Sequence, residues 1–421
     1  MSEFYDVLET RDPAAREAAL LAALPSVVAN AQATAAGAAL LTGVDAAAVT
    51  TRTALATLPV TRKSELLARQ QTARAAGGDP FGGFAAIGWA ALRSQRPARR
   101  VFQSPGPIYE PEGADADYWR FGRALFAAGF RAGDLVHNSF SHHLTPAGSM
   151  METGAHAIGC TVFPGGVGNT ELQLQAMQAL RPDAYAGTPS FLRIALEKAD
   201  ALGIALPSLR KASVGGEAFP PALRDALAAR GIVAYQSYGT ADLGLIAYET
   251  AAREGLVLDE GVLLEIVRPG TGEPVPDGEV GEVVVTTLNP DYPLVRFGTG
   301  DLSAILPGAC PTGRTAPRMR GWLGRADQTA KVRGMFVHPG QVAEVLRRHP
   351  EVGRGRLVIE GEMANDRMTL HAECAGAPEG LQQALAGSLR DVTKLRGEVA
   401  LQAPGSLAND GLVIEDRRRY D

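Results

Sequence analysis

Cysteine is scarce in this chain of 421 residues, and its three copies stand far apart. Cys160, Cys310 and Cys374 are odd in number and show no Cys-x-x-Cys spacing. This pattern argues against both a disulfide framework and a Cys-x-x-Cys metal site. We therefore expect the protein to work in a reducing, cytoplasmic setting.

The chain also lacks a basic stripe. Its formal net charge is -5 and its pI is near 5.9. Arginines 417–419 form the tightest basic cluster, and a cluster at a chain end is typical of a solvated tail. Nucleic-acid-binding domains usually carry a basic face, so we expect no nucleic-acid partner.

Charge is absent from residues 18–44, which raises the question of a membrane segment. This stretch is rich in alanine rather than leucine, and it contains Pro25 and Asn30. It follows an acidic start with Glu3 and Asp6, where a signal peptide would be basic. We therefore predict two packed helices here and no membrane segment.

The length suits a large domain plus a small one, and a hydrophobic content of 46% supports a folded interior. Between residues 118 and 236, helical stretches alternate with short apolar strands. The expected strands are 135–136, 160–163, 183–186, 212–214 and 232–236. This alternation predicts an α/β fold with a mainly parallel sheet covered by helices. Residues 261–306 are β-rich and predict a compact subdomain, and the chain beyond it predicts a small α+β domain.

Two segments fall where strands of the predicted sheet end, which is where ligands of such sheets usually bind. In Val214-Gly215-Gly216-Glu217, the glycines allow the backbone to approach a flat ligand closely. The segment 238–242, YGTAD, combines an aromatic ring, a hydroxyl and a carboxylate. Alone, a tyrosine after a strand is more typical of a packed core.

The region 295–340 contains VRFGTGDL and, after a short insert, GRADQTAKVRGMFVHPG. We expect a tight Gly298-Thr299-Gly300 turn that leaves the Asp301 carboxylate at the mouth of a sheet. A carboxylate there can accept hydrogen bonds from both hydroxyls of a vicinal diol. Gly324-Arg325 then opens a change from loop to strand to helix that is typical of a hinge.

In this order and spacing, these segments resemble the motifs of the adenylate-forming superfamily, in particular its phenylacetate-CoA ligase branch. The segment LPVTRKSEL at 58–66 also matches that branch. The resemblance implies a large N-terminal adenylate-forming domain, 1–326, and a small mobile C-terminal domain, 327–421. It implies an AMP-forming acyl- or aryl-CoA ligase that uses ATP, Mg²⁺ and coenzyme A, and a homodimer.

The resemblance also implies roles for single residues. Tyr238 would stack on adenine, and Asp301 would hold the ribose hydroxyls. Asp242 stands where glutamate is usual and would help to hold Mg²⁺, while Arg325 would contact ribose or phosphate. Asp327 would be the hinge. The other residues implied in the nucleotide site are Gly216, Glu217, Gly239 and Thr240.

Two departures from the family affect phosphate handling. The phosphate loop corresponds to 102–107, FQSPGP, where Ser104 and Gly106 are the remnants and the prolines remove donors. The family's C-terminal lysine has no counterpart in the tail, and Arg417 offers charge without the same compact geometry. Loss of such a donor costs on the order of a few kcal/mol in the transition state. The lysines of the chain are Lys63, Lys198, Lys211, Lys331 and Lys394.

Some relatives carry a structural zinc ion on cysteine and histidine. At the corresponding places this chain has Cys310, Thr250, Val257 and Thr312, which do not make a tetrahedral zinc site. We therefore predict no structural metal.

The acyl pocket is expected in the segment that contains Phe140, His142 and His143. A histidine pair can act in acid/base chemistry or bind an anionic substrate, and His142 is a candidate catalytic residue. Alternatively, one histidine lines the pocket and the other is exposed. Phe140, Met150 and Met151 suit an aryl or apolar carboxylic acid.

Three functions therefore stay open. The first is an AMP-forming acyl- or aryl-CoA ligase that activates a carboxylic acid and transfers it to a thiol. The second is a homologue that kept the fold and AMP-type binding, lost adenylation and serves as a binding or regulatory subunit. The third is an enzyme that acts on an acyl group that is already activated.

Overall fold

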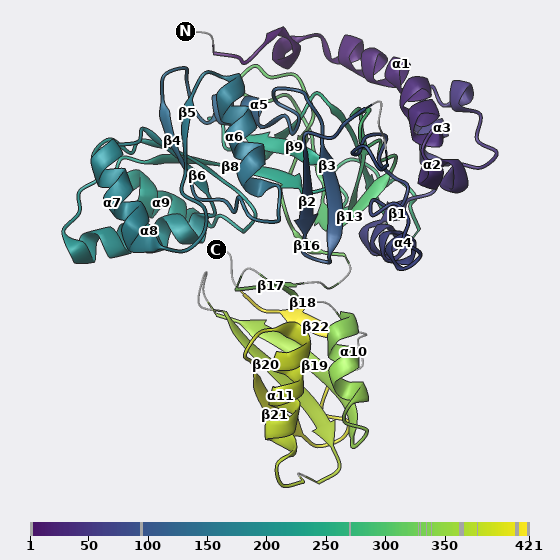
Figure 1. Ribbon diagram of the computed structural model, residues 1–421, viewed down its shortest axis with the longest axis vertical. Helices are drawn as coiled ribbons and strands as arrows, with labels where there is room; N and C mark the ends of the chain where they lie inside the picture. The colour runs from purple at the N-terminus through teal and green to yellow at the C-terminus, as the bar shows by residue number, and fades with distance from the viewer. Residues whose placement is uncertain are drawn as a thin grey trace. The chain divides into compact units, whose positions relative to one another are not determined.

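The structure is a computed structural model (Figure 1). It describes residues 3–92, 96–268, 271–326, 328, 330–333, 335–337, 339–361, 366–376, 378–408 and 412–418, and within these it gives only the backbone of residues 324, 325, 331, 336 and 340. The chain separates into two compact units, Met1–Gly324 and Arg325–Asp421. Each unit has its own hydrophobic core and is described by itself.

The described chain begins with a helical region. Its helices are η1 (Val7–Thr10), α1 (Pro13–Gln32), α2 (Ala35–Leu40), η2 (Ala46–Ala48), α3 (Arg52–Ala56) and α4 (Lys63–Ala75). In this region α1 packs against α2 and η2. Asp12 caps α1 by accepting from the amide of Ala15, and Pro13 fits the first helical position. Leu20, Leu24 and Val28 recur every four residues and are buried in one core cluster. Two helices were predicted here, and no described helix is long and apolar enough to cross a membrane.

The largest sheet has nine strands in the order β14-β15-β10-β9-β8-β7-β6-β4-β5. Its strands are β4 (Leu135–Asn138), β5 (Thr161–Pro164), β6 (Ala184–Gly187), β7 (Lys211–Val214), β8 (Val233–Thr240), β9 (Gly244–Glu249), β10 (Leu256–Leu258), β14 (Ile305–Leu306) and β15 (Arg318–Met319). Strands β4 to β8 pair in parallel, as the sequence predicts. β8 and β9 then pair antiparallel; the YGTAD segment ends β8 and enters the turn between the two strands.

Helices connect the parallel strands: α6 (Ala147–Ala157), α7 (Thr170–Leu180), α8 (Pro189–Leu202) and α9 (Pro221–Ala229) (Figure 1). α5 (Phe121–Ala127) precedes β4 and packs against α6 and β9. α6 packs against β4 and β5, α8 against β6 and α9 against β8. The α/β fold class predicted from the alternating pattern is confirmed.

A second sheet has the order β1-β13-β12-β11, and β16 also pairs with β13. Its strands are β1 (Thr61–Arg62), β11 (Val262–Val267), β12 (Gly281–Thr287), β13 (Phe297–Ser303) and β16 (Gly324–Arg325). A separate hairpin consists of β2 (Arg100–Ser104) and β3 (Ile108–Glu112). Its turn, residues 105–107, lies within the segment 102–107 that the resemblance assigns to the phosphate loop.

The predicted tight turn at Gly298-Thr299-Gly300 is wrong. β13 runs through these residues, and its register against β12 shifts between Glu282 and Val284. Glu282 pairs with Leu302 and Val284 with Gly298, so β13 carries extra residues and bulges. Gly300 has φ +74°, which glycine adopts without strain. A bulge re-aims side chains locally, and Asp301 lies in this one.

The second unit is a small α+β domain. Its elements are β17 (Ala330–Val332), β18 (Met335–Val337), α10 (Pro339–Arg347), β19 (Val352–Glu360), β20 (Arg367–Cys374), α11 (Leu381–Thr393), β21 (Glu398–Gln402) and β22 (Ile414–Asp416). The sheet has the order β21-β20-β19-β22. Leu381, Leu385 and Leu389 line one face of α11 and are buried in the core. This architecture agrees with the predicted small α+β domain.

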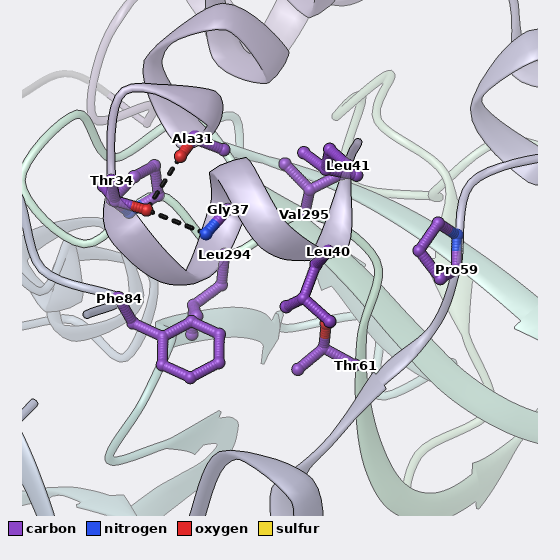
Figure 2. Close-up of a pocket in the computed structure, with 11 residues that line it drawn as sticks. Ala31, Thr34, Gly37, Leu40, Leu41, Pro59, Thr61, Phe84, Leu294 and Val295 are labelled. Carbon is purple, nitrogen blue, oxygen red and sulfur yellow. Dashed lines mark hydrogen bonds between the residues drawn. The ribbon is translucent and has the colours of Figure 1, made fainter. Parts of the chain in front are cut away.

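A pocket lies where α2 meets β1 at Thr61 and the loop before β13 that contains Leu294 (Figure 2). In Figure 2, the Thr34 hydroxyl bonds the Ala31 carbonyl and the Gly37 amide at the start of α2. The lining residues are Ala31, Thr34, Gly37, Leu40, Leu41, Pro59, Thr61, Phe84, Pro293, Leu294 and Val295. This lining has no ionisable side chain, so the pocket offers packing space and no groups for acid/base chemistry.

Candidate functional site

A carboxylate and two aromatic donors meet at β8 and β13. The Tyr238 hydroxyl donates to Asp301 Oδ2 at 2.8 Å, and the Trp322 indole Nε1 donates to Asp301 Oδ1 at 3.0 Å. The Thr299 hydroxyl accepts from the Asp301 amide at 3.1 Å and lies 3.2 Å from the Tyr238 hydroxyl. The structure therefore brings together Tyr238 and Asp301, which are 63 positions apart in the sequence.

The Asp301 side chain is more deeply covered than the predicted turn implied. Asp301 is 8% exposed, whereas Trp322, which bonds it, is 38% exposed. A carboxylate has about four acceptor positions, so a sugar diol could share Asp301 with the two aromatic donors or displace the indole. The bulge in β13 turns this carboxylate toward the exposed indole.

The two glycine-containing segments lie at the carboxyl ends of β7 and β8, as expected. Gly216 follows β7, is exposed and has φ +75°. Glu217 Oε2 is buried and has no hydrogen-bond partner within the described chain. A Cβ at Gly239, near the end of β8, would lie 2.5 Å from the Gly244 carbonyl oxygen, so only glycine fits this position. The Thr240 hydroxyl accepts from the Leu243 amide at 3.1 Å, so it stabilises the turn itself.

Asp242 is paired with a lysine. Asp242 Oδ2 lies 2.8 Å from Lys63 Nζ, and the Asp242 side chain is 0% exposed. Asp242 Oδ1 is also buried and lacks a hydrogen-bond partner in the part of the chain that is described. Lys63 begins α4 and is 34% exposed. The acid predicted to help hold Mg²⁺ therefore already has a cation beside it.

This arrangement does not fit magnesium. Mg²⁺ takes near-octahedral oxygen ligands at about 2.0–2.1 Å and usually keeps several waters. The Asp242 side chain is fully buried, so a hydrated ion cannot reach its oxygens. The Lys63 ammonium is already its counter-ion. The described residues contain no group of three His, Cys, Asp or Glu side chains that could hold a metal.

A second buried carboxyl lies near Asp242. Glu110, on β3, accepts from the Ser104 amide at 3.2 Å and is also bonded by the Ser104 hydroxyl. Burial, and then the negative charge of Asp242, raise the pKa of Glu110 to about 8. Ser104, expected as a remnant of the phosphate loop, is therefore engaged within its own hairpin.

The predicted acyl segment places its histidines differently from one another. His142 Nδ1 lies 3.5 Å from Glu152 Oε2, and His143 is exposed. Burial lowers the pKa of His142, while Glu152 opposes the shift. His142 Nε2 is buried and has no hydrogen-bond partner among the described residues. Phe140 is buried, as are Met150 and Met151 on α6.

An ionic network lies beside this segment. Arg100 Nη1 bonds Glu112 Oε1 at 2.7 Å and the Ser149 hydroxyl at 2.9 Å. Trp119 Nε1 donates to Glu112 Oε2 at 2.8 Å. Arg100 also lowers the pKa of His142 by its charge. A neutral His142 beside an arginine can orient a carboxylate without a full ion pair of its own.

Two predicted residues cannot be placed. Asp327, the expected hinge, lies outside the described residues. Arg325 lies in β16, which pairs with β13, but its side chain is not described. Their roles stay predictions.

The sequence reasoning missed Lys63, Glu110 and Trp322 as site residues. Of the lysines with described side chains, the other three bond groups elsewhere: Lys198 bonds Glu171, Lys211 bonds Asp134, and Lys394 bonds the Asp391 carbonyl. Arg417 pairs with Glu415 and Glu360 on the surface. The sequence signal for Lys63 is its place in LPVTRKSEL, which matches the family but does not point to a site residue.

The residues at the family's zinc positions do cluster. Cys310 Sγ lies 3.1 Å from the Thr312 hydroxyl and 3.6 Å from the Thr250 hydroxyl. One thiol and two hydroxyls are not the thiolate and imidazole ligands of a structural zinc site.

Comparison with known proteins gives the class first. Residues 120–289 match the family model "AMP-binding enzyme". The fold matches 2-hydroxyisobutyryl-CoA ligase in complex with 2-HIB-AMP and CoA, with a TM-score of 0.82 at 23% identity over 100% of this chain and 93% of that one. An open conformation of that ligase matches with a TM-score of 0.71 at 24% identity over 99% of this chain and 95% of that one. The class is that of the adenylate-forming enzymes.

Curated relatives then give the family. Phenylacetate-coenzyme A ligase of Aromatoleum evansii is 34% identical over 310 residues, which are 70% of this chain and 68% of that protein. The enzyme of Pseudomonas putida is 32% identical over 68% of each chain, and that of Thermus thermophilus is 36% identical over 60% of this chain and 58% of its own. The chain belongs to the phenylacetate-CoA ligase family.

Proposed function

We propose that this protein is an AMP-forming acyl-CoA ligase. It would join a carboxylic acid to the α-phosphate of ATP, release pyrophosphate, and then transfer the acyl group from the acyl-adenylate to the thiol of coenzyme A with release of AMP. The observation that carries the proposal is the Asp301 carboxylate held between Tyr238 and Trp322. Residues 120–289 of the chain match an AMP-binding family model, and the resemblance of the VRFGTGDL segment to the family's motif implies that Asp301 is the ribose-binding acid.

The described residues include groups that suit the adenosine part and the acyl part of an acyl-adenylate. The Tyr238 ring offers a flat surface for adenine, and Asp301 offers acceptors for the ribose hydroxyls. Phe140, Met150 and Met151 are buried apolar side chains that suit an aryl or apolar acyl group. His142, with its pKa lowered by burial, would face the substrate carboxylate as a neutral donor.

The test is acid-dependent formation of products. The purified protein with ATP, MgCl₂ and coenzyme A is offered phenylacetate, benzoate, isobutyrate and 2-hydroxyisobutyrate, and pyrophosphate, AMP and acyl-CoA are measured. We expect equal amounts of the three products with an aryl or apolar acid. Absence of pyrophosphate with every acid would contradict adenylation.

The alternative function also has a specific observation behind it. Ser104 is engaged by Glu110, and the turn at 105–107 contains two prolines, which leaves few donors for a triphosphate. An enzyme that acts on a supplied acyl-adenylate needs no such donors. Synthetic phenylacetyl-adenylate with coenzyme A tests this: acyl-CoA and AMP from the adenylate, but not from ATP plus acid, would favour the alternative.

Other implied properties stay proposals. We expect a homodimer because the resemblance implies one, and sedimentation measures it directly. A cytoplasmic location is supported by Cys160, Cys310 and Cys374, which are all buried and unpaired in the described chain.

A further inference from the structure

We propose that Lys63 supplies the positive charge at Asp242 in place of a divalent cation, so that an adenine nucleotide binds this site without magnesium. The inference rests on the proposed nucleotide site and adds a residue and a metal requirement to it. It begins from the ion pair of 2.8 Å between Lys63 Nζ and a fully buried carboxylate.

The backbone holds Lys63 in this position. Lys63 directly follows β1, in which Thr61 pairs with Phe297 and Arg62 with Gly298 on β13. The Arg62 side chain is also ion-paired with Glu282 on β12. Lys63 is therefore anchored to the strand that carries Asp301, and its ammonium does not depend on a flexible loop.

The charges near Asp242 leave little attraction for a second cation. Asp242 and Lys63 neutralise each other, and an ion of charge +2 would have to approach the Lys63 ammonium against like-charge repulsion. The next carboxyl, Glu110, is engaged by the amide and hydroxyl of Ser104. A magnesium ion would also lose water ligands that a buried aspartate cannot replace by itself.

The same geometry suits a phosphate monoester. The Lys63 ammonium is a fixed positive charge that donates to Asp242 and can donate to phosphate oxygens as well. Lys63 is 34% exposed and Asp242 is 0% exposed, so an anion that enters the site meets the cation and not the carboxylate. The group that this geometry suits is the single phosphate of AMP or of an acyl-adenylate, the product and the intermediate of the proposed ligase reaction.

The first arm of the test uses a metal probe alone. Mn²⁺ uptake is measured by electron paramagnetic resonance for the full chain and for Asp242→Asn. We expect no stoichiometric uptake by the unchanged protein, because the Asp242 carboxylate is buried and already paired with the Lys63 ammonium. One equivalent in the unchanged protein that Asp242→Asn abolishes would overturn the proposal.

The second arm measures AMP affinity by calorimetry, in EDTA and in MgCl₂. We expect the same affinity in both buffers, and a loss of roughly ten- to a hundredfold in Lys63→Met, the range for a charge-assisted hydrogen bond. Lys63→Arg keeps the charge and should stay within about threefold of the unchanged protein. Lys211→Met is the matched control, because Lys211 forms a similar ion pair with Asp134 at the start of β7.

The two arms separate this inference from the proposed function. Magnesium-dependent AMP binding with ligase activity intact would overturn the role of Lys63 and leave the ligase in place. No AMP binding in either buffer would count against the nucleotide site, while the Mn²⁺ result would still decide the charge substitution at Asp242.

Discussion

The two acidic groups of the candidate site differ in the kind of partner they have. Among the described bonds, Asp301 accepts from the neutral Tyr238 hydroxyl and Trp322 indole, whereas Asp242 is bonded to the Lys63 ammonium. Neutral donors can be exchanged for sugar hydroxyls while the carboxylate keeps its charge. Breaking a buried ion pair instead leaves an uncompensated charge, which typically costs 3–5 kcal/mol. Asp301, the acid proposed to bind ribose, can therefore exchange its hydrogen-bond donors for those of a ligand. Asp242, which lies at the proposed phosphate position, already has a counter-ion in Lys63.

The largest expected effect is on stability and comes from Arg296, which lies beside the strand of Asp301 and bonds the segment that leads to Lys63. Arg296 precedes β13, bonds Glu265 through Nε at 3.0 Å and donates to the carbonyl of Ala56 at 2.8 Å, in the segment that leads to Lys63. Arg296→Met leaves Glu265 buried and unpaired, and should lower the free energy of unfolding by about 3–5 kcal/mol in urea titrations. The double variant with Glu265→Leu should recover much of the loss. If Arg296→Met and the double variant were equally stable, the unpaired Glu265 carboxylate would not be the cause of the loss.

Asp301→Asn tests the ribose side. Loss of the carboxylate charge weakens both hydrogen bonds from a diol, so the dissociation constant of AMP should rise about 30- to 100-fold by calorimetry. Asp200→Asn on α8 is the control, since Asp200 pairs with Arg230 at the surface. A rise of less than about threefold in Asp301→Asn would remove Asp301 from the nucleotide site.

Glu110→Gln tests the buried carboxyl next to Asp242 through the pH dependence of the free energy of unfolding. Burial and Asp242 raise the pKa of Glu110 from 4.5 to about 8, so the folded state holds a proton that the unfolded state releases between these values. Stability should therefore fall as pH rises through this window, by up to about 1.4 kcal/mol per pH unit. The variant should lose this component of the slope in urea titrations.

The control for this slope is Glu171→Gln. Glu171 is exposed, and Lys198 lowers its pKa, so it titrates below the window and its variant should keep the slope of the unchanged protein. If Glu110→Gln kept the full slope as well, the proton held between about pH 5 and 8 would belong to another group.

The smallest expected effect is that of Tyr238→Phe. The ring for adenine stays, and one neutral hydrogen bond to Asp301 is lost, so AMP affinity should fall about two- to tenfold. Tyr235→Phe, on the same strand, should leave the affinity unchanged. A loss as large as that of Asp301→Asn would mean that Tyr238 orients the carboxylate and does more than add one bond.

Local sequence patterns predicted the fold well because helices and short strands are largely determined by residues that are close together in the sequence. The alternation of helix and strand between 118 and 236 places every parallel strand of the large sheet within a few residues of its observed position. The turn at Gly298 was wrong because the bulge depends on the pairing with β12, which the segment itself does not encode. Tyr238 and Asp301 were found through their motifs, and their roles stay predictions.

Lys63 was missed because its partner is 179 positions away. Nothing within the LPVTRKSEL segment indicates that the ammonium faces a carboxylate. Trp322 and Glu110 were missed for the same reason: the indole bonds Asp301 across 21 positions, and Glu110 is influenced by Asp242 through space. Pairs of this kind need a three-dimensional structure.

Strand β1, two residues long, also has a consequence for the order of folding. Thr61 and Arg62 leave the ribosome early, but the strand that they join, β13, is synthesised more than two hundred residues later. Contacts of such long range form late, so Lys63 must stay hydrated on the nascent chain until most of the first unit has emerged. The ammonium then loses this hydration when β13 arrives, in one of the last events of translation for this unit.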